Sequence, residues 1–158
     1  MSIKDLKPDA QKKSGTGTLK ATISNDYPHA REYNGEPFVF VTDNKKVALF
    51  TTDEFPDDPL TKFNLSLDLP ADKPIAKYEF RSGSLPTPPS FSRVQGSSHT
   101  VYGSDENFGY LNVIDLDLSK GTLKADFIFA YTDYENDGKR HEVTGVIDVA
   151  GLEVITSK

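Results

Sequence analysis

The chain has 158 residues, a formal net charge of −6 and no cysteine. This length fits one ordinary domain that can bury a hydrophobic core, and the lack of cysteine excludes disulfides and thiolate metal sites. The acidic balance and the absence of a long basic stretch argue against nucleic-acid binding and against docking on anionic membranes, because both need clustered lysine and arginine.

The N-terminal segment, residues 1–14, is polar and has almost no apolar side chains. It carries lysine at positions 4, 7, 12 and 13 and proline at position 8. This composition predicts a flexible tail, and it leaves residues 15–158 as a single domain. Neither a secretory signal nor a membrane-spanning apolar stretch is visible, so a cytoplasmic location is the default expectation.

Apolar and polar residues alternate with a period of two along much of the remaining chain. Successive side chains of a strand point to opposite faces, so this alternation predicts strands with one buried face and one solvated face. In residues 63–69 and 123–131, the odd-numbered apolar side chains are expected to face one common interior. The segments with the clearest alternation are residues 19–23, 63–69, 123–131 and 143–149.

Several other segments predict strands with a less regular pattern. Residues 38–41 and 47–50 are apolar on both faces, and the turn residues between them indicate a hairpin. Residues 110–118 change phase by one position, which predicts either a β-bulge or a central strand buried on both faces. Shorter strands are predicted over residues 75–81 and 99–102.

The last two strands are predicted to form a long hairpin. Residues 121–132 and 139–150 flank a linker that ends in Asn-Asp-Gly, a sequence that tolerates positive φ angles. With the strand before them they form a three-stranded meander over residues 109–150. The pattern of residues 121–149 resembles the terminal hairpins of many bacterial β-sandwich domains and is not specific to one family.

These elements define the expected fold class. About nine strands, no sustained helical periodicity, and prolines and glycines between the strands predict an all-β domain. We expect a two-sheet antiparallel β-sandwich, with a closed up-and-down β-barrel as the alternative. Residues 83–98 form the longest irregular stretch, and their three prolines predict an extended binding loop or mobile cover.

Motifs for catalysis are not found in the sequence. His29, His99 and His141 are far apart along the chain, and neither a nucleophile elbow nor a phosphate-binding loop occurs. A carboxylate-based enzyme stays as an alternative because 24 acidic residues are available. The sequence therefore favours a non-enzymatic role.

The acidic turn of the last hairpin is the candidate metal site. Asp133, Glu135 and Asp137 occupy alternate positions before Gly138, like the first half of a calcium-binding loop. Thr144 stands where such a loop places a bidentate glutamate, so the simpler interpretation is an acidic hairpin tip. Calcium is the cofactor that this pattern would bind.

Four tyrosines near predicted loops form the candidate binding site. Tyrosine offers a ring and a hydroxyl group, which suits it to sugars and to protein partners. The leading hypothesis is a non-enzymatic binding module that recognises a glycan or a protein partner through loops at one end of the fold. A barrel that encloses a small ligand and a membrane-acting assembly protein are further alternatives. The four residues are Tyr27, Tyr33, Tyr102 and Tyr134.

Overall fold

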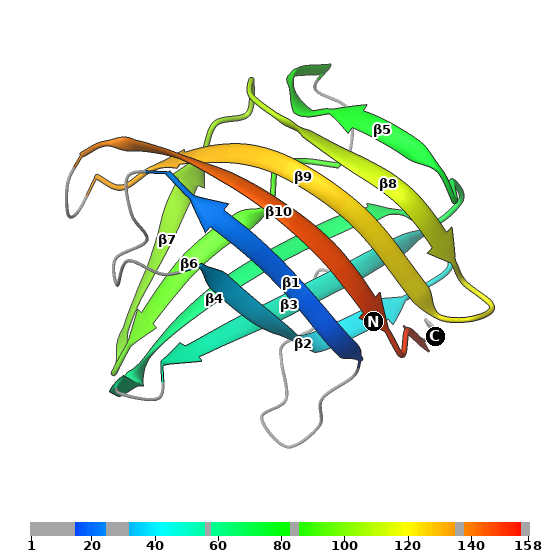
Figure 1. Ribbon diagram of the computed structural model, residues 1–158, viewed down its shortest axis with the longest axis horizontal. Helices are drawn as coiled ribbons and strands as arrows, with labels where there is room; N and C mark the ends of the chain where they lie inside the picture. Colours follow the sequence, from blue (N-terminus) through cyan, green and yellow to red (C-terminus); the bar gives the residue numbers. More distant parts are fainter. Residues whose placement is uncertain (1–14, 25–31, 56–57, 83–85, 135–137, 156–158) are drawn as a thin grey trace.

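Nearly all of the described chain is β-structure (Figure 1). The computed structural model describes residues 15–24, 32–55, 58–82, 86–134 and 138–155, so the predicted tail lies outside the described residues. Within these ranges no helix is long or apolar enough to cross a membrane. The elements are β1 (Thr16–Ile23), β2 (Tyr33–Thr42), β3 (Lys46–Phe55), β4 (Asp58–Pro70), β5 (Ala76–Glu79), the 3-10 helix η2 (Phe80–Ser82), β6 (Ser90–Gln95), β7 (Ser98–Ser104), β8 (Tyr110–Asp117), β9 (Thr122–Thr132), β10 (Arg140–Ala150) and β11 (Glu153–Val154).

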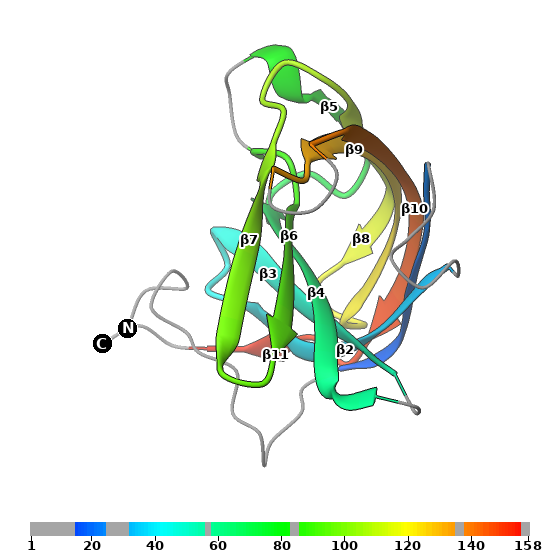
Figure 2. The same cartoon turned by 90° about the vertical axis from the view of Figure 1, so that its left-hand side faces the viewer.

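The strands form two layers that face each other across a common core (Figure 2). One layer contains β1, β10, β9, β8 and β5, and the other contains β3, β4 and β6. β2 and β7 belong to both, because each pairs first with one layer and then with the other. All pairings are antiparallel except that of β11 with β2. The predicted all-β fold of antiparallel strands in two sheets is confirmed.

The two corner strands join the layers into a ring of hydrogen-bonded pairs that closes where β10 pairs with β9. In β2 the register against β3 shifts between Pro37 and Val39, and such a bulge bends a strand and re-aims its side chains. In β7, Tyr102 pairs with Phe91 of β6, whereas Gly103 already pairs with Thr132 of β9. Strands that switch sheets through bends are the usual way to build such corners.

The period-two pattern is confirmed at both of the segments on which the prediction depended. The odd-numbered side chains of residues 63–69 and of residues 123–131 are all buried, at most 7% exposed. They meet in one apolar core that takes residues from both layers. The alternation therefore identified the inward face of the two long central strands.

A cluster of aromatic rings fills the middle of the core. Phe91 lies at its centre, and its ring centroid is 5.0 Å from that of Tyr131, 5.4 Å from Tyr102, 5.7 Å from Phe63 and 6.1 Å from Tyr33. These rings come from β2, β4, β6, β7 and β9. The cluster therefore ties the two layers and both corner strands together.

Two strands were missed by the sequence-based prediction. Residues 90–95 were assigned to the long irregular stretch 83–98, but they form β6, which lies between β4 and β7. The assignment was wrong because only Phe91 and Val94 of its six residues are apolar, and the prolines before it obscured its start. The short β11 was also missed, so the described residues hold eleven strands and not nine. The bulge predicted in 110–118 is confirmed, between Val113 and Asp115.

A buried triangle of hydrogen bonds links β2, β3 and β4. The Tyr33 hydroxyl lies 2.7 Å from Oγ1 of Thr51, which donates to the carbonyl oxygen of Leu65 at 2.8 Å. The backbone amide of Leu65 in turn donates to the Tyr33 hydroxyl at 3.1 Å. Burial raises the pKa of Tyr33 well above its ordinary value, and the nearby Asp53 carboxylate raises it further.

This raised pKa predicts loss of stability in alkali. Above the ordinary tyrosine pKa of about 10, the unfolded chain loses a proton that folded Tyr33 keeps. The free energy of unfolding should then fall by up to about 1.4 kcal/mol per pH unit from this group. Urea denaturation over a pH series measures the slope, and Tyr33→Phe should make it shallower. An unchanged slope in the variant contradicts the assignment.

Candidate functional site

A groove of about 610 Å³ lies on the outer face of the layer built by β3, β4 and β6 and extends onto β2 and β7. Alternation creates this face: Phe63 and Leu65 point into the core, so Lys62, Asn64 and Ser66 of the same strand point outward. A volume of this size falls in the ordinary range of small-molecule sites, about 300–1,000 Å³.

Strand register places the central groove residues in one row across five strands. Glu36 pairs with Thr52, Thr52 with Asn64, Asn64 with Ser92, and Ser92 with Val101. The Thr52 hydroxyl donates a hydrogen bond of 2.9 Å to Oδ1 of Asn64. Since that bond uses the amide oxygen, it orients the Nδ2 donors of Asn64. The middle of the row therefore consists of neutral hydroxyl and amide groups.

An aromatic surface lies beside this row. Phe50 pairs with Ser66, and Ser66 pairs with Ser90, so small side chains follow the ring across the sheet. Phe50 and Phe38 are half-buried and pack against a second, outer apolar cluster of Val39, Val41 and Ala48. This packing supports the two rings from one side while both line the groove.

The other flank of the groove carries charges. Glu54 pairs with Lys62, Lys62 with Val94, and Val94 with His99. The ammonium of Lys62 lies 3.4 Å from a carboxylate oxygen of Glu54, and both side chains are about half exposed or more. Such an exposed ion pair contributes little to stability. With Glu36 also in the lining, this flank disfavours an anionic ligand.

The structure describes three of the four predicted tyrosines and places them in different surroundings. Tyr33 and Tyr102 lie within strands and are buried, at 0% and 4% exposed, where both contact the ring of Phe91. These two tyrosines, which the sequence places near loops, are therefore core residues, because the corner strands turn their rings inward. Tyr134 is 82% exposed at the start of the β9–β10 connection, and Tyr27 lies outside the described residues.

The predicted calcium site is described only at its first residue. Asp133 is buried, at 6% exposed, and its backbone closes the turn through hydrogen bonds with Gly138 and Lys139. Glu135 and Asp137 lie outside the described residues. Within the ranges that the structure describes, no three histidine, aspartate or glutamate side chains are grouped to hold a metal ion. The calcium site therefore stays a prediction.

The groove was not predicted from the sequence as a site, because its residues come from five strands spread over residues 34–101. The signal that was present is local: the outward positions of β4 hold Asn64 and Ser66 where an exposed sheet face often carries longer charged side chains. Comparison with models of protein families, with curated proteins and with solved structures finds no match to this chain.

Proposed function

We propose that this protein is a non-enzymatic binding module that holds a neutral glycan in the groove on its outer sheet face. The observation that carries the proposal is the position of the Phe50 ring beside a row of neutral hydroxyl and amide groups. The proposed site lies on a sheet face and not on the end loops that the sequence suggested.

The aromatic surface supports binding of a sugar ring. One face of a pyranose ring exposes mainly C–H groups, which are apolar and weakly positive, whereas the face of an aromatic ring is negative. Phe50 is half-buried and held by the outer apolar cluster, so little side-chain freedom is lost when a ligand contacts it.

The neutral polar row supports recognition of sugar hydroxyls. Each sugar hydroxyl can donate one hydrogen bond and accept two, as serine and threonine hydroxyls do. Thr52, Asn64 and Ser92 offer both donors and acceptors from three adjacent strands. Because rigid strands position these groups, the geometry of binding is set before the ligand arrives.

The charge of the groove narrows the ligand class further. Its lining contains Glu36, Asp53 and Glu54 against one lysine, Lys62, among the described residues. Since Lys62 already pairs with Glu54, an anionic sugar would meet an acidic surface. A protein partner is less well matched, because protein interfaces place apolar and aromatic anchors at their centre, and the centre here is hydroxyl and amide.

The proposal predicts that Phe50→Ala lowers glycan affinity by about tenfold or more, which corresponds to about 1.4 kcal/mol. A glycan array identifies a ligand, and isothermal titration calorimetry compares the wild-type protein with the variant. Asn64→Ala should lower the affinity for the same ligand, because it removes the Nδ2 hydrogen-bond donor from the central row.

The matched control is Tyr134→Ala, which removes an aromatic ring that is 82% exposed and lies on the last hairpin. It should leave affinity unchanged if the groove binds the ligand. Loss of binding in Tyr134→Ala with retention in Phe50→Ala would move the site to the end loops and contradict the proposal. Thermal unfolding of each variant verifies that the fold is intact.

A further inference from the structure

The groove does not end at Phe50. A second hollow of about 180 Å³, here called the middle hollow, shares Phe50, Ser66 and Ser90 with the groove. A third hollow of about 430 Å³, here called the turn hollow, lies beside the β2–β3 turn and shares Asp68 with the middle hollow. Because neighbouring hollows share lining residues, the three lie one after another along the same sheet face, and this row of hollows is here called the path.

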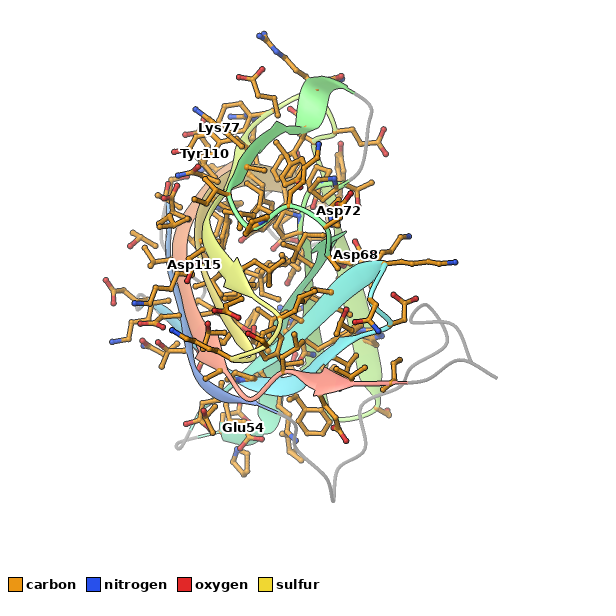
Figure 3. The ribbon with its side chains drawn as sticks, turned by 90° about the vertical axis from the view of Figure 1, so that its right-hand side faces the viewer. Glu54, Asp68, Asp72, Lys77, Tyr110 and Asp115 are labelled. Atoms are coloured by element: carbon orange, nitrogen blue, oxygen red, sulfur yellow. The ribbon has the colours of Figure 1, made fainter. Side chains whose placement is uncertain are left out.

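This path follows the direction of β3 and β4. It starts where Glu54 pairs with Lys62 and ends where Lys46 pairs with Pro70. These β4 positions are eight residues apart, so at about 3.4 Å per residue the path is roughly 27 Å long. Figure 3 shows Asp68 and Asp72 together on one side of the view, with Glu54 well separated from them.

A proline-containing segment forms one wall of the middle and turn hollows. Pro86, Thr87 and Pro88 line the middle and turn hollows, and proline fixes its own φ angle and restricts the residue before it. The Ser104 hydroxyl donates a 2.8 Å hydrogen bond to the carbonyl oxygen of Pro89, which holds this segment against β7.

The charges of the turn hollow are balanced. Its lining contains two lysines, Lys45 and Lys46, and two aspartates, Asp68 and Asp72. The Asp43 carboxylate accepts hydrogen bonds from the backbone amides of both lysines, at 2.9 Å and 2.8 Å, and so shapes the turn. The lysine ammonium groups donate hydrogen bonds and the aspartate carboxylates accept them, so this lining can bind the hydroxyl groups of a neutral ligand.

We infer that the ligand is a linear neutral oligosaccharide that lies along β3 and β4 and occupies the groove, the middle hollow and the turn hollow together. This inference rests on the proposed function and extends it from a sugar to a chain. A row of adjacent hollows about 27 Å long offers room for several sugar units of one chain, one hollow after another.

The test measures affinity against chain length by isothermal titration calorimetry. The probes are three series of linear neutral oligosaccharides, of cellulose, amylose and xylan type, from disaccharide to hexasaccharide. In a series that binds, affinity should rise at least tenfold from disaccharide to hexasaccharide. Asp68→Ala should lower the affinity for the hexasaccharide severalfold and leave the affinity for the disaccharide unchanged. Phe50→Ala should lower both affinities.

Asp148→Ala is the matched control, because Asp148 is exposed on β10 in the opposite layer; it should change neither affinity. If the hexasaccharide binds no more tightly than the disaccharide, or if Asp68→Ala weakens both equally, the chain inference is wrong while the proposed function stands. If no member of the three series binds, the chain inference is wrong for these glycans, and the proposed function is contradicted as well when the glycan array shows no binding of any neutral glycan.

Discussion

Replacing Phe91 with alanine is expected to destabilise the fold by about 3–5 kcal/mol, the usual range for removing a buried phenylalanine ring. Phe91 is fully buried and its ring contacts those of Tyr33, Phe63, Tyr102 and Tyr131. These partners belong to four different strands, so they cannot all move inward to fill the space. A cavity remains, and its lining loses contacts on one side.

Urea denaturation measures the effect as a fall in midpoint with an unchanged slope. Phe91→Leu should cost less, because the larger aliphatic side chain fills part of the cavity. Phe50→Ala is the comparison on the outer face, where the ring is only half-buried, and its cost should be smaller again. If Phe91→Ala unfolds at the wild-type midpoint, the ring cluster does not hold the layers together.

The long strands could be predicted because their signal is local. In residues 63–69 and 123–131 every second side chain is buried, so neighbours in the sequence carry the whole pattern. The turn between β2 and β3 was equally local, since Asn44 adopts a φ of 70° and the Asp43 carboxylate bonds the turn amides. A phase change of one residue likewise indicated an irregularity in β8, where a bulge was one of the two alternatives and is the one that the structure shows.

The buried tyrosines could not be predicted, because their environment depends on long-range closure. Tyr33 is the first residue of β2, and Tyr102 stands next to Gly103. Near each position the strand crosses from one layer to the other, and that crossing carries the ring into the core. Sequence proximity to a turn therefore suggested exposure, whereas the corner produced burial.

The groove could not be predicted either, because its lining depends on the register of strands that are far apart in the sequence. Glu36 and Val101 are 65 positions apart in the sequence, yet the pairings place them at the two ends of one row. A shift of one residue in any of these strands would exchange its inward and outward faces. The polar centre of the row is thus a property of the assembled sheet, which no single segment shows.

Gly109→Ala is expected to destabilise the fold by about 2–4 kcal/mol, from the cost of an unfavourable φ together with overpacking. Gly109 has a φ of 98°, a conformation that residues with a Cβ rarely adopt. A Cβ added there would collide with the carbonyl oxygen of Ile128 on β9. Backbone cannot rotate away as a side chain can, so β8 must separate from β9.

The carbonyl oxygen of Gly109 also accepts a 3.2 Å hydrogen bond from the amide of Phe80, which holds η2 onto the same sheet. The control is Gly103→Ala, because a Cβ at that position meets no atom within 4 Å and its φ is not positive. That control should change stability by no more than about 0.5 kcal/mol. Equal losses for the two variants in thermal unfolding would show that removing a glycine from this layer is costly in itself, and that the contact between residue 109 and β9 is not the cause.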